Sequence, residues 1–270
     1  MLNALIGQKL AIVTPKVQTT RHSILGIIHT DSYQMILTDT PGIIQPKYKL
    51  HERMMHMIDD SLKHTDGAIL LFDATLNFSN QTEITDKIKD TLPFVVVLNK
   101  TDAVSEGRLK EWEIILSKNF TNRKVIYISA EKKINLQQLI DEAYQLLPEH
   151  PPYYDQETLT DRDVRFFISE IIREKIFLLF KQEIPYSTEV IIEEYKEDEK
   201  LDRIRAVIFV ERESQKAILL GKGGSAIKKL GTESRIEIEK FVEKKIFLEL
   251  TVKIRENWRN NATLLKKLGY

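Results

Sequence analysis

The sequence predicts an α/β domain built on buried parallel strands, followed by a smaller α+β domain. Apolar, β-branched runs such as Phe94 to Leu98 are typical of strands buried on both faces, and polar residues follow them directly. Beyond a proline cluster, two segments alternate polar and apolar residues, as half-buried strands do. We therefore expect a first domain at residues 1–150, a linker at 151–160 and a second domain at 161–270.

Composition sets few further bounds. The chain has 270 residues, 42% of them hydrophobic, no cysteine and a formal net charge of zero. Disulfides and thiolate metal sites are therefore excluded. No apolar run approaches the ~20 residues of a spanning helix, and residues 1–20 lack a signal-peptide pattern. We expect a cytoplasmic protein in which any nucleic-acid contact comes from a local basic face.

The elements of the first domain follow from apolar periodicity and turn residues. Leu2 to Ile6 are expected to form the end of a helix, and Gly7 is its stop signal. A Thr30-Asp31-Ser32 turn separates two strands, and Pro148 breaks the last helix. The predicted elements are strands at Ile24 to His29, Tyr33 to Thr38, Ile69 to Phe72, Phe94 to Leu98 and Val125 to Ile128, and a helix at Leu136 to Leu147.

In the second domain, Arg162 to Lys181 has apolar residues at helical spacing and ends before Pro185. Strands are expected at Thr188 to Glu194, Arg203 to Val210 and Ile246 to Ile254, with a helix at Thr232 to Val242.

Asn99, Lys100 and Asp102 leave the carboxyl end of the strand Phe94 to Leu98, where ligands sit in open α/β sheets. One carboxylate can accept both adjacent donors of guanine, its ring N–H and its amine, and adenine offers no such pair. Asp102 could therefore read guanine, while Lys100 lies along the base and the Asn99 amide ties neighbouring loops together. The alternative is a strand that runs into an Asx-turn.

Two further loops also directly follow predicted strands, as the segment Asn99 to Asp102 does. Asp39-Thr40-Pro41-Gly42 follows a strand, so Asp39 could hold magnesium through water, and Gly42 could approach a terminal phosphate with its N–H. Ser129-Ala130 follows the strand Val125 to Ile128 and could touch the base edge. Each motif alone is weak, but their order along alternating strands and helices makes coincidence improbable.

This ordered set resembles the translation-factor-like GTPases. The segment Gln18-Thr19-Thr20-Arg21-His22, followed by the strand pair, is similar to the Era family. The resemblance implies that GTP and GDP bind with Mg²⁺, which Thr19 or Thr20 would contact directly and Asp39 through water. Ile43 stands where Ras-like enzymes carry a water-orienting glutamine, so slow hydrolysis is expected and no catalytic residue is assigned.

The phosphate-cradling signature G-x-x-x-x-G-K-[ST] does not occur in the sequence. In the family this loop runs into a helix, and Leu2 to Gly7 resembles the end of that helix. We expect either a truncated or mis-started reading frame, which we favour, or a relic that has lost the nucleotide. The central strand would be absent too, so Met35 to Leu37 and Ile69 to Phe72 should border a gap.

The second domain contains Gly221-Lys222-Gly223-Gly224, a Gly-x-x-Gly turn expected to follow a strand and to open a helix. It resembles the loop of KH domains, which clamps about four nucleotides through their backbone. Lys222, Lys228 and Lys229 add local positive charge. The alternative is an ordinary glycine turn, but the order of elements favours the type II KH fold.

Together, the resemblances imply an α/β P-loop-NTPase-type GTPase domain, without its first strand and P-loop, followed by an α+β type II KH domain. They imply a GTP-hydrolysing switch that binds small-subunit (16S) ribosomal RNA and assists 30S subunit assembly. They also imply a monomer, with peripheral association at the inner membrane face. The rival is a catalytically inactive RNA-binding adaptor.

Other conspicuous residues have simpler interpretations. We expect Met54 and Trp112 to pack in cores, and His51, His56 and His64 to lie on the surface rather than to bind metal. Trp258 is expected to pack, with RNA contact as the alternative. Four cations form either a basic tail or a solvated helix face: Arg255, Arg259, Lys266 and Lys267.

Overall fold

The computed structural model describes residues 1–16, 18–81 and 92–270. These residues form two compact units that interleave along the chain. The first unit comprises Met1–Lys9, Leu25–Asp39 and Ile58–Thr160, and the second comprises Leu10–Ile24, Thr40–Met57 and Asp161–Tyr270. The linear division at residues 151–160 stays a prediction.

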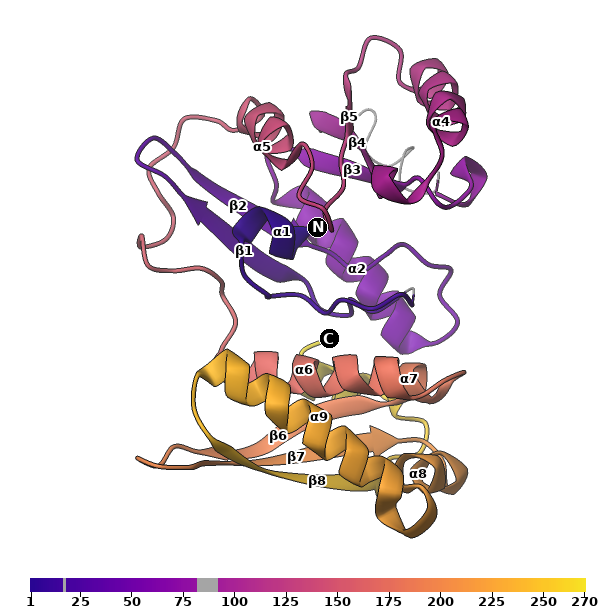
Figure 1. Cartoon of the computed structure of the whole chain (residues 1–270), viewed down its shortest axis with the longest axis vertical. Helices are drawn as coiled ribbons and strands as arrows, with labels where there is room; N and C mark the ends of the chain where they lie inside the picture. Colours follow the sequence, from indigo (N-terminus) through magenta and orange to yellow (C-terminus); the bar gives the residue numbers. More distant parts are fainter. Residues whose placement is uncertain (17, 82–91) are drawn as a thin grey trace. The chain divides into compact units, whose positions relative to one another are not determined.

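The elements from Met1 to Thr160 begin with a short helix and two consecutive strands, and further helices and strands follow (Figure 1). Gly7 ends the first helix in a left-handed conformation, φ 79°, as the sequence predicted. The strands are β1 Ile24–His29, β2 Gln34–Asp39, β3 Ala68–Asp73, β4 Phe94–Asn99 and β5 Val125–Tyr127. The helices are α1 Leu2–Ile6, α2 Lys49–Lys63, α4 Glu106–Asn119 and α5 Leu136–Tyr144, with 3-10 turns η1 Phe78–Asn80 and η2 Thr101–Ala103.

These strands form two sheets instead of one. Strands β1 and β2 pair with each other, and β3, β4 and β5 form a separate parallel sheet in that order. No pairing joins β2 to β3 among the described residues, as expected for strands that border a gap.

Strand β4 is buried on both faces, as its continuous apolar sequence predicted. On one face Val96 and Leu98 pack against Trp112 of α4. On the other face Val95 and Val97 pack in a cluster that contains Leu139 of α5. Burial on both faces fixes the register of the strand, and with it the positions of the residues that follow Asn99.

From residue 164 to residue 254, apart from the four-residue helix at Ile184–Ser187, the second unit has the element order helix, strand, strand, helix, helix, strand, which is that of the type II KH fold. Strand β7 lies between β6, to which it is antiparallel, and β8, to which it is parallel. Figure 1 shows α6 and α9 side by side on one face of this sheet. The strands are β6 Glu189–Lys196, β7 Asp202–Val210 and β8 Ile246–Ile254. The helices are α6 Val164–Leu179, α7 Ile184–Ser187, α8 Glu213–Leu220, α9 Ser225–Val242 and α10 Ala262–Lys267, with 3-10 turns η3 Lys222–Gly224 and η4 Trp258–Asn260.

The expected strand immediately before the glycine loop was wrong, since helix α8 occupies that place. The side chain of Gln215 accepts hydrogen bonds from the backbone of Glu211 and Arg212 and so fixes the first turn of α8. A separate helix from Thr232 was also wrong. Helix α9 continues through Gly231 because Leu230, Ser234 and Ile238 follow each other at four-residue spacing and are all buried.

We expect Asp163→Ala to lower the free energy of unfolding by about 1 kcal/mol, because Asp163 caps helix α6. Its carboxylate accepts a hydrogen bond from the backbone N–H of Phe166 at 2.8 Å. Asp163→Ser retains a capping oxygen and should stay close to the wild type. Urea denaturation followed by circular dichroism measures both, and an alanine variant as stable as the serine variant would contradict the capping role.

Candidate functional site

The turn after β4 places the predicted base-reading residues at the carboxyl edge of the parallel sheet. Asn99 is the last residue of β4 and stands opposite Asp73, the last residue of β3. Lys100 then adopts a left-handed conformation, φ 62° and ψ 34°, and begins the 3-10 turn η2. Asp102 lies in this turn with its carboxylate exposed and without an ion pair in the described part of the chain. Both its oxygens are therefore available to a ligand.

Asn99 joins this turn to the loop after β5, as the sequence predicted. Its side-chain oxygen accepts a hydrogen bond from the backbone N–H of Ala130 at 3.0 Å. Thr101 adds two contacts, because its backbone N–H and its hydroxyl both donate to the carbonyl of Ile128. Ser129 is fully buried, and its hydroxyl accepts from the backbone of Lys132. The two loops are thus fixed to each other before any ligand binds.

Lys100 also forms an ion pair that sequence reasoning missed. Its ammonium lies 2.6 Å from a carboxylate oxygen of Asp73. Burial alone would raise the pKa of Asp73, but hydrogen bonds from Lys100 and Thr75 hold it below its ordinary value. The sequence signal was available, since Asp73 ends an apolar strand in the same way as Asp39 and Asn99 do.

The other predicted nucleotide contacts divide between the two units. Asp39 ends β2 in the first unit. Burial, the largest effect, lowers the pKa of the Met1 amine, and the charge of Lys100 acts in the same direction, whereas the charge of Asp39 raises that pKa. Five predicted residues belong to the second unit: Thr19, Thr20, Thr40, Pro41 and Gly42.

Gly42 is exposed, and a side chain built there would meet nothing within 4 Å. The surrounding protein therefore does not require glycine at this position on steric grounds. Close approach of a ligand would provide such a requirement.

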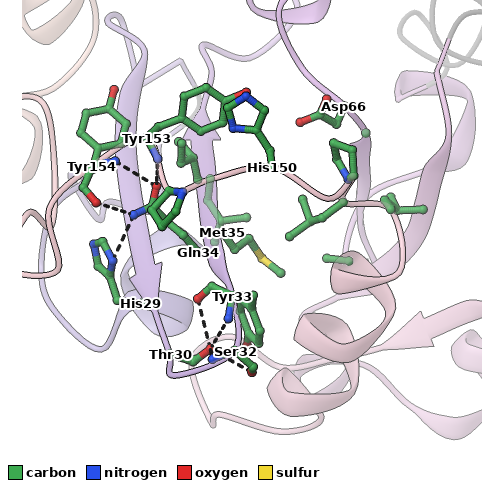
Figure 2. A pocket seen from close by; sticks show the side chains of 18 of the residues that line it. His29, Thr30, Ser32, Tyr33, Gln34, Met35, Asp66, His150, Tyr153 and Tyr154 are labelled. Atoms are coloured by element: carbon green, nitrogen blue, oxygen red, sulfur yellow. Dashed lines mark hydrogen bonds between the residues drawn. The ribbon is translucent and has the colours of Figure 1, made fainter.

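The cavity of about 350 Å³ in the first unit lies elsewhere (Figure 2). It is lined at the amino ends of β2 and β3 by residues such as Gln34, Met35 and Asp66. Gln34 accepts hydrogen bonds from the backbone N–H groups of Tyr153 and Tyr154 and so fixes the connector. Because ligands of open α/β sheets bind at the carboxyl ends of strands, we assign this cavity no role in nucleotide binding.

In the second unit, the segment that contains Thr19 and Thr20 is held by a buried cation. The side chain of Arg21 is 4% exposed. It donates to the carbonyl of Thr188 at 2.7 Å and to the carboxylate of Glu189 at 2.9 Å. Its other terminal nitrogen donates to the carbonyls of residues 185 and 186, both at 3.1 Å. The sequence shows no pairing between these distant segments, so this network was not predicted.

Tyr270 completes the same cluster. Its hydroxyl donates to the Glu189 carboxylate at 2.7 Å, and its ring stacks on His22 with centroids 4.1 Å apart. Burial raises the pKa of Tyr270 well above its ordinary value, so the hydroxyl keeps its proton at neutral pH.

The segment Thr40–Met57 is packed within the second unit by apolar contacts. Leu50 and Met54 form a buried cluster with Trp258, Leu265 and Tyr270. The packing predicted for Met54 and Trp258 is confirmed. The Trp258 indole N–H donates to the carbonyl of residue 187 at 3.0 Å, inside the protein.

The surface position expected for His51 was wrong, whereas His56 and His64 are exposed. His51 is buried because its ring packs against Tyr48, with centroids 3.8 Å apart. Burial, followed by the charges of Arg21, Arg259 and Lys47, lowers its pKa from 6.5 to about 4. His51 is therefore neutral at pH 7.

The glycine loop of the second unit has two distinct steric requirements. A side chain at Gly221 would lie 2.8 Å from the backbone nitrogen of Ala226, so this position needs glycine to pack against α9. Gly223 and Gly224 have positive φ, 58° and 78°, and open space around them. The loop thus presents bare backbone to its surroundings, as the clamping of a phosphate backbone requires.

Of the predicted basic residues, Lys222 lies in this loop, and Lys228 and Lys229 lie in the amino-terminal part of α9. Lys222, Lys228 and Lys229 are exposed, and Lys229 has only a weak ion pair, 3.8 Å from Glu233. Of the four C-terminal cations, Arg259 pairs with Glu211 and its guanidinium lies over the ring of Tyr48. The other three are exposed.

Comparison with known proteins identifies both parts of the chain. Residues 1–100 match the family described as 50S ribosome-binding GTPase, and residues 183–259 match the KH domain family. GTPase Era of Thermoanaerobacter sp. (strain X514) is 40% identical over 274 residues, which span 100% of this chain and 91% of that protein. The chain belongs to the Era family of GTPases. A chloroplastic ERA-like GTPase of Oryza sativa subsp. japonica is 42% identical over 280 residues, 100% of this chain and 65% of that protein.

Solved Era structures have the same fold. A variant of Aquifex aeolicus Era bound to GDP and AlF₄⁻ superimposes with a TM-score of 0.94 at 32% identity, covering 100% of this chain and 93% of that one. Era in complex with MgGDPNP and nucleotides 1506–1542 of 16S ribosomal RNA gives 0.93 at 33% identity, with the same coverage. In the described part of this Era-family chain, no helix is long and apolar enough to cross a membrane.

We expect the stability of the second unit to fall as pH decreases from about 6.5 towards 4. His51 binds a proton in the unfolded chain near pH 6.5 but in the folded protein only near pH 4, so protonation favours unfolding in that window. Between pH 7 and 4.5 the wild type should lose about 2 kcal/mol more than His51→Asn. Urea titrations at several pH values measure this, and parallel profiles would contradict it.

Proposed function

We propose that this chain is a GTP-hydrolysing switch that uses Mg²⁺, binds small-subunit ribosomal RNA through its KH fold and assists assembly of the 30S subunit. The observation that carries the proposal is the turn at Asn99 to Asp102, in which the loop contacts are complete and one carboxylate stays available. The order of elements in the second unit supports the RNA-binding half.

The base-recognition residues fit guanine. Asn99 and Thr101 are committed to the neighbouring loop, which leaves Asp102 to meet the ligand. A carboxylate there would accept from the ring N–H and the exocyclic amine of guanine together. Because adenine lacks that pair of donors, the carboxylate would be left unmatched, and a site of this kind rejects the wrong base by roughly 10⁴-fold.

Binding of the phosphates is supported less completely than recognition of the base. The 270 residues do not contain G-x-x-x-x-G-K-[ST], which would supply the N–H cradle and a lysine. Asp39, Gly42 and the threonines at 19 and 20 correspond by family resemblance to contacts with magnesium and the terminal phosphate. We therefore derive only the recognition of the base, from Asn99, Thr101 and Asp102. We assign no step of hydrolysis and no catalytic group.

The RNA half rests on the glycine loop. Gly223 and Gly224 leave room for phosphates, and the exposed lysines at 222 and 228 lie at either end of this stretch. The description of the family matched by residues 1–100 names the 50S subunit, whereas the solved Era complex contains 16S ribosomal RNA. We follow the Era complex because it aligns over the whole chain and includes the KH fold.

The alternative function is that of a catalytically inactive RNA-binding adaptor. The whole-chain similarity to GTPases supports the enzyme over the adaptor. A monomeric state and a cytoplasmic location, with peripheral association at the inner membrane face, are part of the proposal and rest on family resemblance alone.

We predict that Asp102→Asn shifts preference from GDP towards xanthosine diphosphate. The substitution replaces one acceptor oxygen with a donor, and xanthine offers a carbonyl where guanine has its amine. The loss for GDP should be about 1–3 kcal/mol, the cost of an unmatched buried polar group. Titration of wild type and variant with both nucleotides measures it, and an unchanged preference for GDP would remove Asp102 from the site.

We predict that Gly224→Asp abolishes RNA binding and leaves the fold intact. The variant places a carboxylate where a phosphate passes, and aspartate tolerates positive φ better than most residues. The probe is an RNA fragment from the 3′ end of 16S ribosomal RNA. Lys222→Ala should weaken binding modestly and reduce its salt dependence by about one unit. RNA affinity equal to that of the wild type in Gly224→Asp, with an unchanged circular dichroism spectrum, would refute the role of the glycine loop in RNA binding.

A further inference from the structure

Asp73 and Lys100 form an ion pair at the place where β3 and β4 end. The two strands are in register there, with Asp73 opposite Asn99, so the side chain of Lys100 spans the carboxyl ends of both strands to reach Asp73. The left-handed turn at Lys100 redirects the chain at this point. The four methylenes of Lys100 therefore lie between a fixed backbone and a paired ammonium.

The Asp73 carboxylate is itself held in place. One oxygen accepts from the backbone N–H of Thr75 at 2.9 Å and from its hydroxyl at 2.6 Å, which leaves the other for Lys100 at 2.6 Å. The side-chain amide of Gln81 bonds both the N–H and the carbonyl of Asp73, at 2.8 and 3.2 Å. The indole of Trp112 donates to the carbonyl of the next residue, Ala74.

This arrangement is not explained by stability. The Lys100 side chain is 54% exposed, and an ion pair that is open to solvent contributes little to folding. A free lysine would sample many rotamers, and a pair formed before the ligand arrives removes that freedom in advance. The geometry is therefore that of a prepared binding surface.

We propose that Asp73 is a positioning residue for guanine recognition, which holds the Lys100 stem in place as the surface on which the base lies. This inference rests on the proposed function, because it takes the turn at Asn99 to Asp102 to be the base site. Asp73 contacts no nucleotide in this account and acts through Lys100. Thr75 supports it by fixing the second carboxylate oxygen.

The first test needs no nucleotide. Lysines are reductively dimethylated with ¹³C, which keeps their charge, and the Lys100 signal is assigned by its loss in Lys100→Arg. In the wild type this signal should be shifted and less mobile than those of other lysines, and in Asp73→Asn it should join them. Asp60→Asn is the matched control, since it breaks an exposed Lys63–Asp60 pair of 2.9 Å. A Lys100 signal unchanged by Asp73→Asn overturns the proposal.

The second test measures the base preference. Wild type, Asp73→Asn, Thr75→Val and Asp60→Asn are titrated with GDP and with ADP. We expect Asp73→Asn to weaken GDP about 10-fold without changing ADP, Thr75→Val to weaken GDP less, and Asp60→Asn to change neither. If the wild type prefers GDP and Asp73→Asn keeps that affinity, the positioning role fails while the proposed function stands. If the wild type does not prefer GDP, the proposed function fails, and the lysine signal still decides whether Asp73 holds Lys100.

Discussion

The parallel pairing of β3 with β4 fixes the base-recognition end of the first unit. Because β4 is buried on both faces, a shift of one residue would exchange its two apolar faces and displace every residue after Asn99. In the observed register Asn99 reaches the loop after β5, and Lys100 reaches Asp73. Asp102 is then left with an available carboxylate. One packing constraint thus separates residues that hold the turn from the residue that can meet a ligand.

The second unit depends on a different constraint, the burial of Arg21. A buried guanidinium without partners would be strongly unfavourable, and here the carboxylate of Glu189 and three backbone carbonyls accept its hydrogen bonds. The segment Leu10–Ile24 is consequently a folded part of the same unit as the KH elements. In this Era-family chain, the threonines expected to sense the nucleotide are therefore covalently next to a residue that the KH unit holds in place.

Local sequence was sufficient where one residue type has one physical role. The β-branched run Phe94 to Leu98 could only suit a strand buried on both faces, and Gly7 and Gly224 mark positions with positive φ. Local sequence gave wrong predictions where contacts with other parts of the fold decide the structure. A helix was expected to begin at Thr232, but the buried stripe through Leu230 and Ile238 keeps α9 continuous through Gly231, because tertiary burial outweighs the modest cost of one glycine. His51 was expected on the surface, but its ring packs against Tyr48, and burial together with the distant charges of Arg21 and Arg259 lowers its pKa, which local sequence does not show.

The sequence by itself determined the two-part organisation, the KH fold and the candidate base-reading and RNA-binding residues, since these depend on periodicity, motif order and glycine conformation. Only the tertiary structure decided which of these side chains already have partners within the protein. The partners of Asn99, Lys100 and Arg21 lie 31, 27 and more than 160 residues away along the chain. No periodic pattern records a contact between segments so far apart, because such a pairing is created when the strands and helices pack.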